Sequence, residues 1–270
     1  MTPEETACEI ARGYGIQVDA PIVLQDTNNI VLWLAPSPVV AKIGTGALRR
    51  LDEELTFGIN LEAASAPVVG PTSLLPRIVH RRDGCHVTFW PYIQRTAGDF
   101  PSRSIATALG ALHDALDGLD AEEVVVVPSF SEEPRLVARR LDEPGFAPEL
   151  AARDRELLLR ALEDIDLENH FREVLLHGSP HRFNILNVEG SPRFIDFETV
   201  CRGPVEWDLA HLEPAVANAY PGQVDERLLG RCVRLVSAKT SAWCWEQAGH
   251  NEQMRMHAEH HLAVVREGLG

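Results

Sequence analysis

The hydrophobic periodicity of the chain changes near residue 90, and this change limits the folds that the chain can adopt. Before it, short runs rich in Val, Ile and Leu are separated by turn-forming residues, a pattern typical of antiparallel strands. The predicted strands cover 21–24, 29–35, 38–44, 74–79 and 85–90, and the predicted helices cover 3–14 and about 47–64. An Arg-Arg-Asp-Gly turn is expected to join the last two strands as a hairpin.

After Pro91-Tyr92 the apolar residues recur mainly at helical spacing. Helices are expected at 105–116, 148–165, 205–220, 225–238 and 243–267, and short strands at 173–178, 184–188 and 192–197. The sequence therefore predicts an α+β protein with a β-rich N-terminal lobe at 1–90. A mainly helical C-terminal lobe would follow at 91–270, with a joint near 89–93.

Charge and composition exclude several classes of partner. The net charge is −15, of which −3 falls in residues 1–90 and −12 in residues 91–270. Such acidity argues against nucleic acid or an anionic membrane as the main partner. It would attract a cationic small molecule to the second part, although acidity is also a common solubility device.

The sequence carries no sign of export or membrane insertion. No apolar run approaches the roughly 20 residues that span a bilayer, and the N-terminus resembles no signal peptide. The five cysteines are odd in number and form no C-x-x-C pair, which indicates a reduced, cytoplasmic protein.

The segment 175–198 places polar residues in short turns between apolar runs. His177, His181 and Asn184 share one loop, and Asp196 follows Asn184 by 12 residues. Because the intervening sequence is typical of a strand, a Glu-Gly turn and a strand, a hairpin would return Asp196 close to Asn184. An amide oxygen and a carboxylate form a hard oxygen pair suited to Mg²⁺. The segment therefore predicts the metal half of a phosphoryl-transfer site.

The scarcity of lysine points to the phosphate half of such a site. The chain has 23 arginines but only two lysines, Lys42 and Lys239. Lys42 lies in the buried-looking run VVAKIG, where an unpaired charge would cost several kcal/mol, so it needs an acidic partner. Glu53 or Glu54 of the following helix could reach it, as in kinases that hold nucleotide phosphates this way. The competing interpretation is a lysine on an exposed strand face.

Three ordered motifs resemble those of the aminoglycoside phosphotransferase family, which belongs with the choline kinase-like proteins to the protein-kinase-like superfamily. The family has H-G-D-x-H-x-x-N, then I-D-F/W-E, then G-P-x-x-x-D-L-A. This chain has HGSPHRFN at 177–184, IDFE at 195–198 and GPVEWDLA at 203–210. The resemblance extends over about 22–220, including the lysine strand, the helix acid and the LGALHDAL helix. It implies a two-lobed protein-kinase-like fold that uses ATP or GTP with Mg²⁺.

The resemblance assigns nucleotide-binding roles to residues of the N-terminal lobe. Lys42 would hold the phosphates with Glu54 as its partner. Glu54 is preferred over Glu53 because Leu61 then falls where the family has the leucine that ends the helix. The backbone of the joint would meet the adenine, which assigns Phe89, Trp90, Tyr92 and Ile93 to nucleotide binding. The loop 25–31 would cover the phosphates.

Other roles follow for the segment 175–210. Asn184 and Asp196 would bind Mg²⁺, and Asp208 would hydrogen-bond the backbone of the catalytic loop. Ser179 departs from the family pattern, because this position is the aspartate that accepts the proton of the substrate hydroxyl. A serine cannot act as that base at neutral pH, and general-base effects are worth roughly 10²–10⁴ in rate.

Three explanations of Ser179 remain open. His181 or Glu198, the nearest candidates by sequence, replaces the base; the protein binds nucleotide or ligand without efficient turnover; or the serine was engineered to trap a complex. For His181, a residue that braces the loop is the competing interpretation.

Two other groups of histidines suggest metal sites as alternatives to the kinase-like site. His177 and His181 with Asp196 could form a metallohydrolase site, but Gly178 and Pro180 favour a loop rather than the helix such ligands use. In the C-terminal segment, His257 and His261 lie four residues apart on a predicted helix. This spacing could bind adventitious Ni²⁺ or Zn²⁺, but it is more typical of a solvated helix face.

The sequence thus predicts a small-molecule kinase that moves the γ-phosphate of ATP or GTP to a hydroxyl of a cationic or sugar-like acceptor. The rival is a catalytically impaired pseudokinase that binds nucleotide or ligand, followed by a metal-dependent hydrolase. The identity of the acceptor and the choice between monomer and homodimer stay open.

Overall fold

The computed structural model of the protein describes residues 1–26, 29–44, 49–95, 100–119, 127–163, 171–249 and 251–268. Packing divides the chain into two compact units. The first consists of Met1–Val125 and His181–Thr199, and the second of Val126–Pro180 and Val200–Gly270. The hairpin segment 184–196 therefore packs in the same unit as the N-terminal strands. The division into functional lobes at residue 90 stays a prediction.

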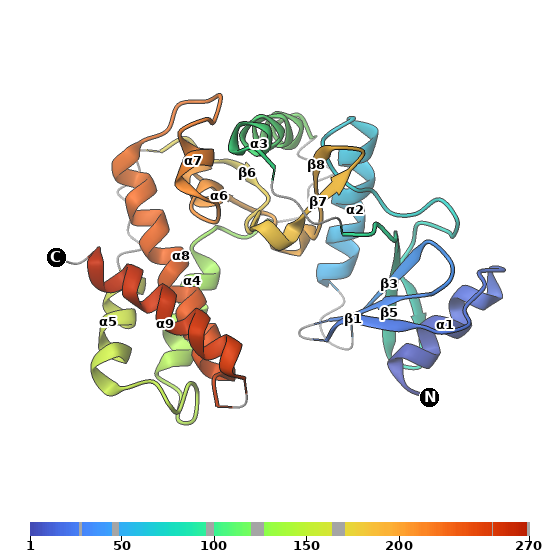
Figure 1. Ribbon diagram of the computed structural model, residues 1–270, viewed down its shortest axis with the longest axis horizontal. Helices are drawn as coiled ribbons and strands as arrows, with labels where there is room; N and C mark the ends of the chain where they lie inside the picture. The colour runs from blue at the N-terminus through green and yellow to red at the C-terminus, as the bar shows by residue number, and fades with distance from the viewer. Residues whose placement is uncertain are drawn as a thin grey trace. The chain divides into compact units, whose positions relative to one another are not determined.

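The first unit is built on a five-stranded antiparallel sheet with the order β1-β2-β3-β5-β4 (Figure 1). Its strands are β1 (Ile22–Asp26), β2 (Ile30–Trp33), β3 (Val39–Gly44), β4 (His80–Arg82) and β5 (Cys85–Pro91). All six residues of β3 are buried, as expected for a central strand rich in Val, Ala and Ile. The sheet therefore has its core along β3, where Lys42 lies.

Helices and a second hairpin complete the first unit. They are α1 (Pro3–Gly13), α2 (Arg49–Ala63), α3 (Ser102–Asp117), the 3₁₀ turns η1 (Arg182–Asn184) and η2 (Phe197–Thr199), and the hairpin strands β7 (Ile185–Val188) and β8 (Ser191–Phe194). α1 begins with a capping box, in which Thr2 and Glu5 satisfy each other's backbone N–H groups. Apolar residues of α1 share one core with β2, β3 and β5.

The second unit is mainly helical. It contains α4 (Glu132–Leu141), α5 (Ala152–Glu163), α6 (Val205–Leu209), α7 (Pro214–Ala217), α8 (Glu226–Gln247) and α9 (Glu252–Glu267), with the paired strands β6 (Val174–Leu176) and β9 (Cys201–Gly203). Residues of α4, α5, α8 and α9 form one apolar core, and Phe130, Trp207 and residues of β6, β9 and α8 form another. The second core supports the loop that follows β6.

The α+β fold class predicted from the sequence is confirmed, with a small antiparallel sheet and a mainly helical part, but one predicted strand is wrong. Residues 74–79 form a bent, irregular segment, and the strand that pairs with β5 is β4 at His80–Arg82. Pro76 lacks an N–H, and its carbonyl accepts the backbone N–H of Ile78 at 2.9 Å, which bends the chain. The predicted hairpin turn is present, with Asp83 and Gly84 both at positive φ.

Helix boundaries in the second unit also differ from the prediction. The segment 205–220 forms two short helices, because Pro214 begins α7 and cannot continue a helix from α6. α8 runs unbroken to Gln247, through the gap expected at 239–242. Helix α4 and strand β9 were not predicted. The first residues of the predicted helix 47–64 lie outside the described part of the chain.

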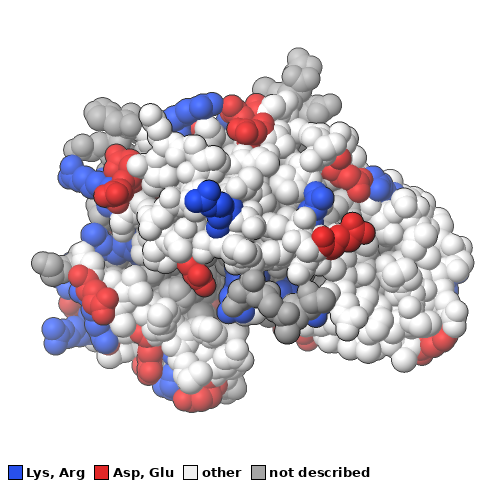
Figure 2. Space-filling model, turned by 45° about the horizontal axis from the view of Figure 1, so that its top comes forward, with Lys and Arg blue, Asp and Glu red and all other residues white. Residues whose placement is uncertain are grey.

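Charged side chains of both signs are interspersed on the face drawn in Figure 2, where neither sign forms a continuous patch.

Candidate functional site

Lys42 lies at the centre of a cluster of carboxylates in the first unit. Its Nζ atom is 2.9 Å from an oxygen of each of Glu54 in α2, Asp196 after β8 and Glu198 in η2. The lysine side chain is 10% exposed and that of Glu54 is 3% exposed. The prediction that Lys42 is buried and reaches Glu54 rather than Glu53 agrees with this geometry. Asp196 and Glu198 lie more than 150 residues after Lys42 in the sequence.

The electrostatics of this cluster show an excess of negative charge. Burial alone would lower the pKa of the Lys42 ammonium, but the attraction of the three carboxylates outweighs it and raises that pKa. Burial raises the pKa of the Glu54 carboxyl, whereas the positive charge of Lys42 lowers it. The negative charges of Asp196 and Glu198 raise this pKa further. One ammonium thus faces three carboxylates, and a second cation would relieve their repulsion.

The cluster gathers oxygen atoms of the kind that can bind a divalent cation such as Mg²⁺. Glu54, Asp196 and Glu198 each offer an oxygen atom, and these atoms all lie within 4.8 Å of one another. Carboxylate oxygens are the hard ligands that Mg²⁺ prefers. The sequence predicted Asp196 as a metal ligand, whereas it assigned Glu198 to catalysis.

The β7–β8 hairpin determines where Asn184 and Asp196 lie. Ile185 pairs with Phe194, and the backbone N–H of Ile195 donates to the carbonyl oxygen of Asn184 at 3.0 Å. Asn184 and Asp196 therefore emerge at the same end of the hairpin, as the sequence predicted. Asp196 has a φ of 70°, a conformation that is costly for a non-glycine residue and concentrates at functional sites. A shared metal ion for these two residues stays a prediction.

Glu198 is held by two partners in the first unit. Besides its contact with Lys42, its Oε1 atom accepts a hydrogen bond from Nδ2 of Asn29 at 2.5 Å. Asn29 precedes β2, in the loop that the resemblance places over the phosphates. Its two preceding residues, 27 and 28, lie outside the described part of the chain. Glu198 is thus a partner of Lys42, and its role as a substitute base stays a prediction.

The loop that contains Ser179 lies in the second unit and is braced by Asp208. The two carboxylate oxygens of Asp208 accept the backbone N–H groups of His177 at 2.9 Å and Gly178 at 2.8 Å. Nε1 of Trp207 donates to the carbonyl oxygen of Gly178 at 3.1 Å. The bonds that the resemblance predicted for Asp208 are therefore present. They hold the backbone directly before Ser179, which itself is half-buried.

His181 begins the part of the loop that belongs to the first unit. Its carbonyl oxygen accepts the backbone N–H of Asn184 at 2.7 Å, which closes the turn η1. Its ring lies edge-on to Phe183, with 6.1 Å between ring centroids. These contacts are those of a residue that braces the turn, while its catalytic role stays a prediction.

The four residues of the predicted joint lie at the end of β5 and just beyond. Phe89 is buried, and Nε1 of Trp90 donates to Thr88 at 3.0 Å. Tyr92 stacks on Trp33 with 4.0 Å between ring centroids, and its backbone N–H already donates to the carbonyl of Pro38 at 3.0 Å. The β3–β5 pairing therefore occupies this N–H. The side chain of Ile93 lines a separate cavity of the first unit.

Lys239 is a second buried lysine, to which the sequence motifs gave no role. Lys239 in α8 contacts Glu133 at 2.6 Å and lies 5.2 Å from the centre of the Trp207 ring. It therefore supports the tryptophan that bonds Gly178. The scarcity of lysine could have drawn attention to it, but Glu133 lies in a helix that was not predicted.

The sheet, the helix glutamate and the aspartate-bearing hairpin together define a protein-kinase-like fold. A family model described as the phosphotransferase enzyme family (APH) matches residues 25–243. The chain therefore belongs to this phosphotransferase family, as the sequence motifs indicated.

Solved structures agree with this fold. The GDP and kanamycin complex of APH(2")-IIia has a TM-score of 0.70 at 17% identity, covering 99% of this chain and 98% of that one. Amicoumacin kinase with AMP-PNP, Ca²⁺ and Ami reaches 0.72 at 11% identity, covering 99% and 96%. A choline/ethanolamine kinase family protein from Mesorhizobium loti reaches 0.65 at 16% identity, covering 100% and 95%. Among curated proteins, none matches the chain in sequence.

In the described part of the chain, no helix has both the length and the apolar character that crossing a membrane requires.

Proposed function

We propose that the protein transfers the γ-phosphoryl group of ATP or GTP to a hydroxyl group of a small molecule, with Mg²⁺. The observation that carries this proposal is the position of Lys42, whose ammonium contacts Glu54 of the helix and Asp196 of the hairpin, each at 2.9 Å. A lysine held this way is suited to phosphate oxygens, because the helix acid orients it.

Each residue of the cluster then has a role in binding. Lys42 holds the α- and β-phosphates, and Glu54 keeps its ammonium in place. Asn184 and Asp196 hold Mg²⁺, which neutralises charge on the phosphate oxygens when it is bound. Glu198 keeps its ion pair with Lys42 and its hydrogen bond from Asn29. The joint 89–93 meets the nucleotide base through the backbone beyond β5, because the N–H of Tyr92 already donates within the sheet.

The acceptor is a small cationic or sugar-like alcohol. The net charge of −12 in residues 91–270 favours a cation. Similar folds are known in complexes with kanamycin and with spectinomycin. We also infer that the protein works in the cytoplasm, since the five cysteines are free and four of them are buried.

Ser179 supports a second candidate function, nucleotide binding without efficient turnover. In phosphoryl transfer the bond to the leaving group is largely broken before the acceptor attacks, so positioning and charge neutralisation supply most of the catalysis. Loss of the base therefore slows the reaction rather than abolishing it. Asp208 still holds the backbone before Ser179 in place, and this supports retained turnover over pure binding.

Calorimetric titration of ATP and GTP with Mg²⁺ tests nucleotide binding. We expect binding to the unmodified protein and its loss in Lys42→Ala and Asp196→Ala. Arg81→Gln is the matched control, because this arginine contacts Asp52 on the surface, away from the Lys42 cluster. If no nucleotide binds, or if all variants bind alike, both candidate functions are wrong.

A turnover assay with Ser179→Asp separates the two candidates. Slow transfer by the unmodified protein to an aminoglycoside, choline or other small alcohol supports the kinase. In that case His181→Ala and Glu198→Gln locate the substitute base. Transfer only by Ser179→Asp supports the binding protein.

A further inference from the structure

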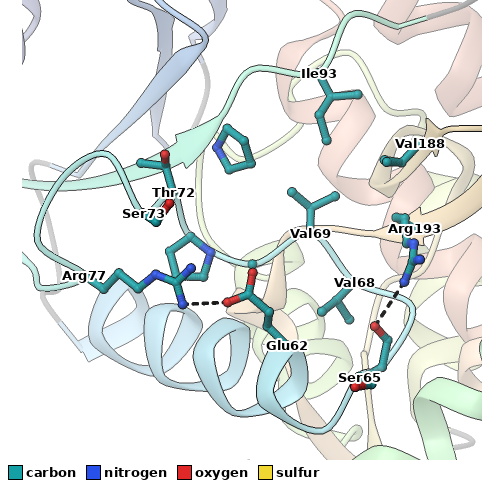
Figure 3. Close-up of a pocket in the computed structure, with 14 residues that line it drawn as sticks. Glu62, Ser65, Val68, Val69, Thr72, Ser73, Arg77, Ile93, Val188 and Arg193 are labelled. Atoms are coloured by element: carbon teal, nitrogen blue, oxygen red, sulfur yellow. Dashed lines mark hydrogen bonds and ion pairs between the residues drawn. The ribbon is translucent and has the colours of Figure 1, made fainter. Parts of the chain in front are cut away.

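A cavity of about 560 Å³ opens in the first unit (Figure 3), and none of the residues of the Lys42 cluster lines it. Its walls come from the end of α2, the segment 65–73, the chain just after β5, and both strands of the β7–β8 hairpin. Cavities of this size accommodate drug-sized molecules. The phosphoryl-transfer proposal uses two of the lining residues, Pro91 and Ile93 of the joint, but gives the cavity itself no role.

The segment 65–73, which forms one wall, is fixed by backbone hydrogen bonds. The N–H of Val69 donates to the carbonyl of Phe194 at 3.0 Å, and the N–H of Phe194 donates to the carbonyl of Pro67 at 2.8 Å. The N–H of Thr72 donates to the carbonyl of Phe89 at 3.1 Å. The segment is therefore anchored to β8 on one side and to β5 on the other. A cavity with such a wall is preformed, so a ligand need not order it.

The middle of the cavity is apolar. Val68, Val69, Ile93 and Val188 line it together with proline rings, and Figure 3 shows the labelled Val69 and Ile93 side chains pointing toward one another. Gly70 lets this wall lie close to Glu62, because an added Cβ atom would lie 2.5 Å from the present position of the Glu62 carboxylate. An apolar, flat part of a ligand fits against such a surface.

The charged groups of the cavity favour an anion. Arg77 and Arg193 enter from opposite sides, as Figure 3 shows, and Glu62 is the single acid among the lining residues. Nη1 of Arg77 donates to Glu62 at 2.6 Å, so its charge is already balanced. Arg193 makes a hydrogen bond of 3.4 Å to the carbonyl of Ala66, which engages one of the five N–H donors of a guanidinium. In a chain of net charge −15, this cavity carries an arginine whose charge is not balanced by a lining acid.

We propose that this cavity is a second ligand site, which takes a small molecule with a flat apolar body and one anionic group. The anion binds the guanidinium of Arg193, whose fork matches a carboxylate or sulfonate. The apolar body lies against Val69, Ile93 and Val188. The cavity shares Pro91 and Ile93 with the joint that the phosphoryl-transfer proposal assigns to the nucleotide base, but it shares no residue with the Lys42 cluster. Binding of the anion to Arg193 can therefore be tested whether or not the protein binds nucleotide.

Calorimetry with 1-naphthoate tests the site, with 1-naphthamide and 1-naphthylmethylammonium as neutral and cationic analogues of the same shape. We expect naphthoate to bind at least tenfold more tightly than naphthamide, because a hydrogen bond between two charged groups is stronger than one to a neutral amide. The ammonium analogue should not bind. The proposal is wrong if naphthoate shows no binding at millimolar concentration, about 50 times that of the protein. It is also wrong if naphthoate and naphthamide bind with equal affinity.

Variants of the lining residues locate the binding. Arg193→Gln should weaken naphthoate binding at least tenfold and leave naphthamide binding unchanged, whereas Arg81→Gln removes an equal charge elsewhere in the first unit and should change neither. Val188→Phe fills the apolar part of the cavity and should weaken both ligands. It also serves as an independent test if Arg193→Gln fails to fold. Naphthoate binding that survives both Arg193→Gln and Val188→Phe would show that the ligand binds elsewhere, and the proposal would be wrong.

Discussion

Lys42 and Glu54 form a buried ion pair, with 2.9 Å between Nζ and Oε1 and side chains that are 10% and 3% exposed. The same ammonium contacts Asp196 and Glu198, so a single lysine neutralises part of the charge on three carboxylates. Removing one partner of a buried pair costs more free energy than the pair contributes, because the other charge is left uncompensated. The pair therefore links the stability of the first unit to its proposed phosphate site.

Lys42→Met should lower the free energy of unfolding at pH 7 by about 3–5 kcal/mol, because Glu54 then lacks its counter-charge in a buried position. Denaturation by urea, followed by circular dichroism, measures this change. The double variant Lys42→Met/Glu54→Met should recover part of the loss, since it removes the most deeply buried carboxylate, whereas Asp196 and Glu198 still lack their contact with Lys42.

The pH dependence provides a control for this interpretation. Burial raises the pKa of Glu54, and without Lys42 that pKa should rise further. A carboxyl whose pKa is raised on folding destabilises the native state above its ordinary pKa and less so as the pH falls. The difference between Lys42→Met and the unmodified protein should therefore shrink toward acid pH, and an equal difference at all pH values would contradict the assignment.

Asp208→Ala should loosen the loop before Ser179, because the buried N–H groups of His177 and Gly178 lose their acceptor. Each unsatisfied donor costs about 1–3 kcal/mol. We expect amide hydrogen exchange at these two positions to accelerate by at least tenfold. Asp208→Asn keeps one oxygen acceptor and should show a smaller effect. Unchanged exchange in Asp208→Ala would mean that other contacts hold the loop.

His211 should make the protein less stable in mild acid. Its Nδ1 atom lies 2.9 Å from the carbonyl oxygen of Trp207, and its buried Nε2 atom has no hydrogen-bond partner among the described residues. Burial and the nearby Lys239 lower the pKa of His211 to about 3. Between that value and the ordinary pKa of about 6.5, only the unfolded chain takes up the proton, so stability falls as the pH falls.

His211→Gln tests this dependence, because an amide N–H can still donate to the Trp207 carbonyl but does not titrate. From pH 6.5 to 5, above the range of most carboxylates, the variant should lose less stability than the unmodified protein. The difference in slope should approach about 1.4 kcal/mol per pH unit. Parallel stability curves for the two proteins would show that His211 titrates normally.

The sequence predicted those parts of the site that depend on local patterns. Lys42 and Glu54 follow from a buried strand and the next helix, and Asn184 and Asp196 follow from a short hairpin. The contact between Lys42 and Glu198 depends instead on the tertiary packing of η2 against α2. The pair of Lys239 and Glu133 likewise joins helices 106 residues apart in sequence, which no local pattern reveals.

The errors in the fold have a similar origin. Residues 74–79 have the composition of a strand, but Pro76 removes a donor that the sheet would need and forms a turn. The gap expected in α8 at 239–242 disappears because Lys239, Ser241 and Ala242 are buried against neighbouring elements, and tertiary packing then outweighs local propensity.

Gly203→Ala should destabilise the protein, because Gly203, the last residue of β9, packs closely against Phe130. An added Cβ atom would lie 2.8 to 3.0 Å from Cδ1, Cβ and Cγ of Phe130, which is buried and packs on Trp207. Since these atoms lie at the base of the ring, Phe130 cannot move away by a simple rotation, and such overpacking costs about 1–3 kcal/mol. Gly230→Ala is the matched control, because nothing lies within 4 Å of its added Cβ atom in helix α8. Thermal unfolding should show Gly230→Ala more stable by about 0.5–1 kcal/mol and Gly203→Ala less stable, and a shift of equal sign for both would contradict the packing argument.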